Sequence, residues 1–222
     1  MKTALVIGSN GLIGRHLLFE LIKSDRYSKV IALTRKDLII SHPKLQQEIV
    51  SYDSLDSSAT YFNVDDVFCC IGTTKAKTPN QNDYRKIDHD IPVNIGKICL
   101  DKGAKQYLMV SSMGADINSS IFYSKLKGET ERDLASIGYS AFHAIRPSLL
   151  LGERKEQRIG ESIFKLLAKP INLLMLGPLK AYKAIEGIQV AKALLAIASL
   201  EKQGNHIWMN NQLFDQAETL KK

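Results

Sequence analysis

The chain has 222 residues, and 45% of them are hydrophobic, which is enough apolar material for one sizeable core and one α/β domain. The net charge of +7 comes from basic residues that are scattered along the chain, so the composition argues against a nucleic-acid-binding arm and favours an anionic small ligand. No apolar run reaches the roughly 18 residues that a membrane-spanning helix needs, so we expect no membrane segment.

Compartment and redox state follow from the N-terminal residues and the cysteines. The first residues lack the successive charged, apolar and small-residue regions of a signal peptide, so the sequence predicts a cytoplasmic protein. The three cysteines, Cys69, Cys70 and Cys99, fit neither a disulfide framework nor metal-ligand spacing. We therefore expect buried, reduced thiols and no metal site, with a reactive Cys70 at the end of a strand as the alternative.

Short β-rich runs alternate with segments of helical periodicity along the first two thirds of the chain. Strands are predicted at residues 4–7, 29–33, 48–50, 67–71, 106–110 and 141–145. Because parallel β-α-β units have right-handed crossovers, this alternation predicts an α/β fold with a doubly wound parallel sheet, a Rossmann fold.

The pattern loosens after residue 150. A helix is predicted at 160–168, an apolar patch at 171–176, a helix at 185–200 and a strand at 206–209. No linker is long enough to separate these elements from the rest. The sequence therefore predicts a single domain over 1–222, with a cofactor-binding core at about 1–150 and a small C-terminal substrate-side region of lid and closing elements at about 151–222.

The first predicted strand runs into a glycine-rich loop, "GSNGLIG", that opens a helix. The first glycine permits a tight turn, the second lets the backbone approach a ligand, and the third lets helix and strand pack closely. The free N–H groups of the helix N-terminus then suit phosphate oxygens, although a structural turn rich in glycine and asparagine is the alternative. The candidate pyrophosphate-binding residues are Gly8, Ser9, Asn10, Gly11, Leu12, Ile13 and Gly14.

The end of the second predicted strand, "LTRKD", indicates which dinucleotide is bound. An acidic residue here would accept hydrogen bonds from a ribose 2′-hydroxyl, whereas an arginine pairs with a 2′-phosphate. Arg35 and Lys36 stand at this place and the nearest acid, Asp37, lies further into the loop. The sequence therefore predicts NADP(H), with an exposed basic pair in a polar turn as the alternative.

A second constellation, "VSSMGADINSSIFYSKLKGETE", begins where the fifth predicted strand ends at Ser111 and Ser112. Tyr123 and Lys127 are four residues apart, so on a helix they share one face. An ammonium beside a phenol favours the phenolate, which lets the phenol exchange a proton with a carbonyl or alcohol while a serine holds the substrate oxygen. The alternative is one packed ring and one solvated lysine.

Together with "RPSLLLG" after the sixth predicted strand, these motifs resemble the short-chain dehydrogenase/reductase superfamily. "CCIGTTKAK", "SSMGAD" and "FYSKLKGETE" resemble its atypical branch of Tat-interacting-protein-type oxidoreductases. The resemblance implies that Ser112 orients the substrate oxygen, that Tyr123 is the general acid/base, and that Lys127 assists Tyr123 and binds the nicotinamide ribose. It also implies further cofactor contacts at Asp53 (adenine), Ile71, Gly72, Thr73 and Thr74 (ribose and nicotinamide), Ser111, and Pro147 and Ser148 (carboxamide).

One residue departs from the superfamily pattern. Asp88 lies where many members carry an asparagine that supports the proton relay, and its alternative role is that of a carboxylate on a helix surface. Relatives often pair through the helices around the catalytic tyrosine, which implies a homodimer.

Two functions stay open at this point. The first is an NADP(H)-dependent oxidoreductase acting on a small carbonyl or alcohol, because the Ser112, Tyr123 and Lys127 set is complete. The second is a non-catalytic NADP(H)-binding regulatory or partner-binding module, because the C-terminal part offers little material for a large substrate pocket.

Overall fold

Alternating apolar residues in the computed structural model, which describes residues 1–151 and 182–220, build one central parallel sheet. The seven strands lie in the order β3-β2-β1-β4-β5-β6-β9 and every neighbouring pair is parallel, which confirms the predicted doubly wound α/β fold. The strands are β1 (Lys2–Ile7), β2 (Tyr27–Thr34), β3 (Leu45–Ile49), β4 (Asp66–Cys69), β5 (Gln106–Val110), β6 (Ala141–Arg146) and β9 (Gly204–Met209).

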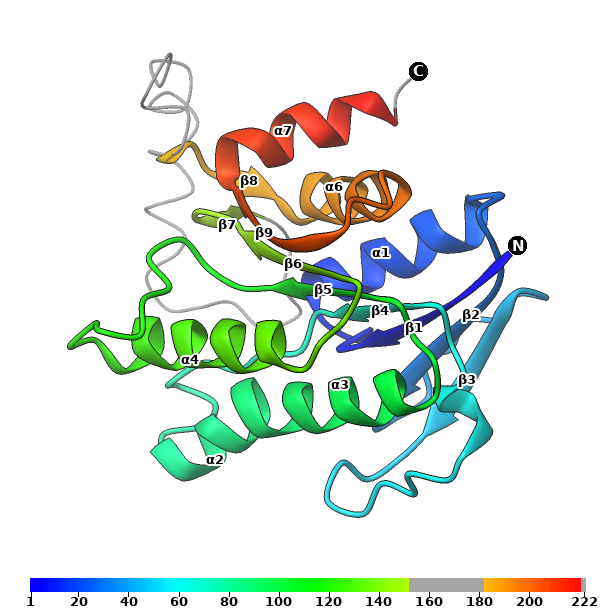
Figure 1. The fold of residues 1–222 in the computed structure, drawn as a ribbon, viewed down its shortest axis with the longest axis horizontal. Coiled ribbons are helices and arrows are strands. Elements are labelled where there is room, and N and C mark those ends of the chain that lie inside the picture. Colours follow the sequence, from blue (N-terminus) through cyan, green and yellow to red (C-terminus); the bar gives the residue numbers. More distant parts are fainter. Residues whose placement is uncertain (152–181, 221–222) are drawn as a thin grey trace.

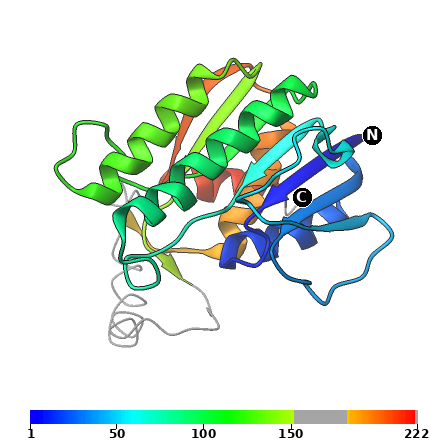
Figure 2. The same cartoon turned by 90° about the horizontal axis from the view of Figure 1, so that it is seen from below.

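Helices cover both faces of the sheet (Figure 1). On one face lie α1 (Leu12–Lys23) and α6 (Gly187–Ser199), with α7 (Asn210–Thr219) packed on α6. On the other face, α3 (Ile91–Asp101) and α4 (Phe122–Ser136) lie side by side across the strands (Figure 2). Shorter elements complete the described chain: the turn η1 (Thr60–Phe62), the helix α2 (Gln81–Arg85), the π-helical segment η2 (Lys86–Asp90), and the strand pair β7 (Leu150–Leu151) and β8 (Ile185–Glu186).

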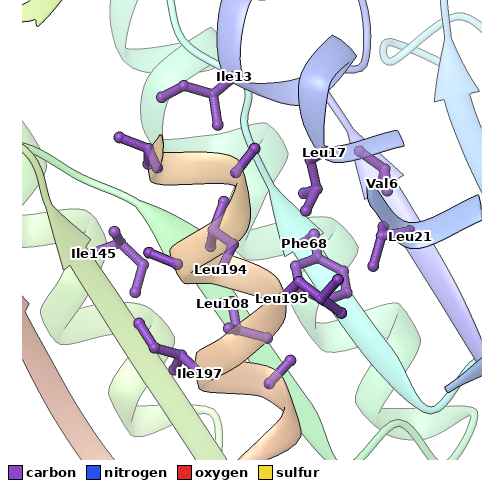
Figure 3. Close-up of a cluster of buried hydrophobic side chains, with 14 of the residues drawn as sticks. Val6, Ile13, Leu17, Leu21, Phe68, Leu108, Ile145, Leu194, Leu195 and Ile197 are labelled. Carbon is purple, nitrogen blue, oxygen red and sulfur yellow. The ribbon is translucent and has the colours of Figure 1, made fainter. Parts of the chain in front are cut away.

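The two-residue period of the strands divides the core into two halves. Val6, Phe68, Leu108 and Ile145 point to the α1 and α6 face, and their neighbours along each strand point to the α3 and α4 face. Figure 3 shows Leu194, Leu195 and Ile197 of α6 among these strand residues and the α1 leucines. Helix α6 therefore belongs to the main core, and β9 to the main sheet.

The structure corrects several predicted boundaries. The third strand covers residues 45–49 rather than 48–50, and the strand expected to reach residue 71 ends at Cys69. The helix expected from residue 185 begins at Gly187, because Ile185 and Glu186 pair with β7. The predicted helix at 160–168 and the apolar patch at 171–176 lie outside the described residues. No helix of the described segments is long and apolar enough to cross a membrane.

Candidate active site

The loop after β1 shows which of its glycines the protein itself requires. Gly8 has φ +83°, and a Cβ there would lie 2.4 Å from the Cys70 carbonyl carbon. A Cβ on Gly14 would lie 2.3 Å from the Gly8 carbonyl oxygen. A Cβ on Gly11 would meet that same oxygen at 3.2 Å, a much smaller overlap. The fold therefore needs glycine at 8 and 14, whereas Gly11 leaves open space at the N-terminus of α1.

The polar groups of this loop suit a phosphate ligand. Gly11 caps α1 without a side chain, so the first helical N–H groups stay free to donate. The Ser9 hydroxyl is buried and has no hydrogen-bond partner among the described residues. Asn10 Nδ2 donates to Thr34 Oγ1 at 2.8 Å, so the loop is fixed to the end of β2. The loop thus presents several hydrogen-bond donors that suit the predicted pyrophosphate contact.

Two basic residues follow β2 beside this cradle. Arg35 and Lys36 are both exposed, while the Asp37 carboxylate accepts the Ile39 N–H at 2.9 Å. Burial raises the pKa of the Tyr52 hydroxyl to about 12, and the positive charge of Arg35 acts against that rise, which places the guanidinium near Tyr52. The end of β2 therefore presents positive charge where an adenosine ribose would lie.

The predicted adenine contact, Asp53, has a different partner. Its Oδ1 lies 2.7 Å from Lys86 Nζ, and both side chains are largely exposed. The carboxylate is thus already paired within the protein, and any adenine contact would have to share it.

The segment after β4 is attached by hydrogen bonds to the end of β1 and to Tyr84 of α2. Cys70 N–H donates to the Ile7 carbonyl at 2.8 Å, and the Tyr84 hydroxyl donates to the Thr73 carbonyl at 3.0 Å. The hydroxyls of Thr73 and Thr78 lie 2.8 Å apart. These bonds fix the segment that holds Ile71, Gly72, Thr73 and Thr74 at the end of β4.

Ser112 follows the end of β5, and Tyr123 and Lys127 lie on α4. The Ser112 hydroxyl is buried and has no partner among the described residues. Tyr123, in the first turn of α4, is 39% exposed, and Lys127, one turn further, is 3% exposed. The interpretation of Lys127 as a solvated stem is therefore wrong.

Lys127 keeps its charge despite this burial. Burial alone lowers the pKa of the ammonium, but the negative charge of Asp88 and the Tyr123 hydroxyl raise it, and the net direction is upward. Lys127 thus carries a positive charge beside Tyr123 throughout the physiological range.

The residue responsible is Asp88, which the sequence placed at the superfamily's asparagine position with a helix-surface carboxylate as the alternative. Asp88 is 1% exposed, and its Oδ1 lies 2.9 Å from Lys127 Nζ, so its interpretation as a helix-surface carboxylate is wrong. It lies on the π-helical segment η2, where His89 is buried as well. A buried lysine implies a counter-ion, and this signal adds to the place of Asp88 in the superfamily pattern.

The predicted contacts Ser111 and Ser148 use their hydroxyls inside the protein. Ser111 Oγ donates to Glu131, which Arg146 also binds through Nε at 3.0 Å and Nη2 at 2.6 Å. Ser148 Oγ donates to the Lys183 carbonyl. Ser111 and Arg146 therefore fix the ends of β5 and β6 to α4, and a cofactor contact at Ser111 or Ser148 would have to use the backbone or share an occupied hydroxyl.

The cysteines do not form a reactive centre. Cys69, Cys70 and Cys99 are free, and burial raises the pKa of each thiol. The alternative of a reactive Cys70 is thus not supported. Within 1–151 and 182–220, no group of three or more histidine, cysteine or acidic side chains could hold a metal ion.

Comparisons with known proteins agree with this geometry. The model of the "NAD dependent epimerase/dehydratase family" matches residues 4–181. The chain belongs to this family. Protein HTATIP2 of Rattus norvegicus is 32% identical over 164 residues, which are 72% of this chain and 67% of the relative. The resemblance to the Tat-interacting-protein type is thus confirmed.

A second curated relative corrects the predicted location. Protein FMP52, mitochondrial, of Eremothecium gossypii is 29% identical over 88% of both chains, and homologues from Emericella nidulans and Coccidioides immitis carry the same description. The prediction of a cytoplasmic protein is contradicted by these mitochondrial names.

Solved structures of epimerase/dehydratase-type proteins share the fold. MoeE5 in complex with UDP-glucose and NAD is 18% identical with a TM-score of 0.68 over 98% of this chain and 81% of that chain. A UDP-N-acetylglucosamine 4-epimerase from Methanobrevibacter ruminantium M1 is 18% identical with a TM-score of 0.70 over 100% of this chain and 83% of that one. At this identity the likeness concerns the fold alone.

Proposed function

We propose that the chain is an NADP(H)-dependent oxidoreductase that reduces a small carbonyl compound or oxidises the corresponding alcohol. The observation that carries this proposal is the charged, buried Lys127 one helical turn from the half-exposed Tyr123. The Ser112 hydroxyl, buried without a partner among the described residues, supports it. A packed structural tyrosine would need neither a buried ammonium nor an unsatisfied hydroxyl beside it.

The residues at the glycine loop fit a dinucleotide. Gly8 and Gly14 let the backbone of the loop pack tightly, and the buried Ser9 hydroxyl has no partner among the described residues. The N–H groups at the start of α1 would hold the pyrophosphate, and Lys127 would contact the nicotinamide ribose. When bound, NADPH would supply the hydride, so this chain's own residues have to supply only one proton to the carbonyl oxygen.

The proton step falls to Tyr123. In the reducing direction its hydroxyl gives a proton to the substrate oxygen, and in the oxidising direction its phenolate takes that proton back. The Lys127 ammonium stabilises the phenolate that forms, and the Ser112 hydroxyl donates a hydrogen bond to the substrate oxygen. Tyr123 and Ser112 thus act at the substrate oxygen, and Lys127 acts at the phenolate oxygen of Tyr123.

The preference for NADP(H) rests on Arg35 and Lys36. An arginine fork makes charge-assisted bonds to a phosphate that an NAD ribose lacks, each contributing on the order of 1.5–3 kcal/mol before solvent screening. Because Arg35 is exposed, we expect Arg35→Ala to weaken NADPH binding by about one order of magnitude and NADH binding hardly at all. Equal losses for both cofactors would refute the assignment of Arg35.

Catalysis itself is tested by NADPH consumption against a panel of aldehydes, ketones and quinones, with Tyr123→Phe as the inactive control. Consumption that requires Tyr123 supports the proposal. Micromolar NADPH binding with no turnover of any substrate would instead favour the non-catalytic cofactor-binding module.

A further inference from the structure

Tyr84 of α2 contacts both the loop after β4 and the helix that carries Tyr123. Its side chain is buried. Its hydroxyl donates to the Thr73 carbonyl at 3.0 Å, and its ring packs edge-on against the Tyr123 ring with centres 6.4 Å apart. The proposed function gives these two segments different tasks, cofactor contact and proton transfer, and one buried side chain joins them.

The ring of Tyr84 belongs to a small aromatic cluster at the first turn of α4. Helix α2 lies beside this turn (Figure 1), and Tyr84 also packs edge-on against Phe122 with ring centres 5.6 Å apart. Aromatic pairs favour this geometry, and their contact is worth more than the area it buries. Because the Tyr123 ring is half-exposed, it has few packing partners, and Tyr84 is one of them.

The hydroxyl of Tyr84 fixes one side of the Thr73 peptide unit, and the same helical run fixes the other side. Asp88, four residues after Tyr84, accepts the Thr73 N–H through Oδ2 at 2.7 Å. A loop whose backbone groups are bonded in this way is ordered before a ligand arrives, so less ordering entropy is lost on binding. Each of these bonds should therefore contribute to the affinity for a ligand that lies against the loop.

We propose that Tyr84 is a positioning residue with two separable parts. Its hydroxyl keeps the loop at Thr73 in the conformation that contacts the cofactor, and its ring keeps the Tyr123 ring in place for proton transfer. The roles toward cofactor and substrate rest on the proposed function, whereas the two contacts do not. A tyrosine that only filled the core would affect stability and neither of these roles.

Tyr84→Phe tests the hydroxyl, because it keeps the ring and removes the bond to Thr73. By calorimetry, we expect the Kd for NADPH to rise about two- to tenfold, with a smaller change in turnover at saturating NADPH. Tyr139→Phe is the matched control, since the Tyr139 hydroxyl also donates to a backbone carbonyl, that of Gly96 at 2.7 Å, beyond the opposite end of α4.

The control should lower Tm and leave NADPH affinity and turnover unchanged. An unchanged Kd in Tyr84→Phe, or equal rises in Kd in both variants, would overturn the role of the hydroxyl.

Tyr84→Leu tests the ring. Without the edge contact the Tyr123 ring gains freedom, so turnover at saturating NADPH should fall at least tenfold below that of Tyr84→Phe. If Tyr84→Leu does not fold, Tyr84→Met takes its place, because methionine fills more of the volume and also lacks the ring. Equal turnover in the phenylalanine variant and the folded variant without the ring would overturn the role of the ring.

A double-mutant cycle tests the ring contact without cofactor or substrate. Denaturant unfolding is measured for Tyr84→Leu, Tyr123→Leu and the double variant, or for the Tyr84→Met counterparts. The double variant should be less destabilised than the two single losses predict, by about two- to tenfold in the unfolding equilibrium constant. Additive losses would overturn the coupling of the two rings. If the coupling and the change in Kd appear but no variant turns over any substrate, the proposed function fails while the two contacts of Tyr84 stand.

Discussion

Gly11 and Gly14 provide a matched pair that separates ligand binding from folding. In Gly14→Ala, the new Cβ would lie 2.3 Å from the Gly8 carbonyl oxygen, so backbone has to move by about 1 Å. Overpacking of this kind costs roughly 1–3 kcal/mol or more, which lowers Tm by about 2–12 °C in a domain of this size. In Gly11→Ala the contact is 3.2 Å and φ is −76°, so the loss of stability should be about 1 kcal/mol or less.

NADPH binding should show the opposite order of effects, with the larger loss of affinity in Gly11→Ala. The Gly11 methyl would stand in the space where a pyrophosphate approaches the start of α1, and we expect NADPH affinity to fall at least tenfold, or about 1.4 kcal/mol. Calorimetry with NADPH, combined with thermal unfolding of both variants, measures the two effects. Normal NADPH binding to a folded Gly11→Ala protein would refute this position for the pyrophosphate.

Two further predictions concern the helix that carries Tyr123 and the edge of the sheet. A Cβ on Gly128 would lie 2.5 Å from the Ile117 nitrogen, so Gly128→Ala should displace the loop after Ser112 from α4. We expect turnover, measured by steady-state kinetics, to fall at least tenfold, while NADPH affinity, measured by calorimetry, changes little. Retained turnover would contradict this prediction. His143 is fully buried, and burial with the charges of His206 and Lys202 lowers its pKa to about 4. Between about pH 6.5 and pH 4 the unfolded chain therefore binds more protons than the folded protein does. The free energy of unfolding should drop by on the order of 2 kcal/mol as the pH falls through that range. Denaturant unfolding of the wild type and His143→Phe should show this dependence only in the wild type; equal pH dependence in both would exclude His143 as its source.

The sequence predicted the parallel sheet because the alternation of strand and helix leaves few topologies. It also identified the glycine loop and the Ser112, Tyr123 and Lys127 set, since their residue types and spacing are visible in the chain. It could not show that the Ser111 hydroxyl binds Glu131 while the Ser112 hydroxyl has no partner among the described residues, because that depends on which side of the strand end each residue faces.

Asp88 shows a second limit of sequence reasoning. It lies buried in a π-helical turn between α2 and α3, a feature without a reliable sequence signal. The end of β4 was misplaced for a simpler reason: the apolar run continues through Cys70 and Ile71, although the pairing with β5 stops at Cys69. Register with a neighbouring strand, rather than local composition, sets that boundary.

Replacement of Tyr123 by phenylalanine tests the central claim most directly. The variant removes one hydroxyl from the surface of α4 and leaves Lys127 paired with Asp88. With a substrate found in the panel, the account predicts a fall in turnover of roughly 10²–10⁴-fold with NADPH affinity nearly unchanged, the usual contribution of a positioned proton donor. Turnover within a few-fold of the wild type would contradict the assignment of Tyr123 as the catalytic acid/base.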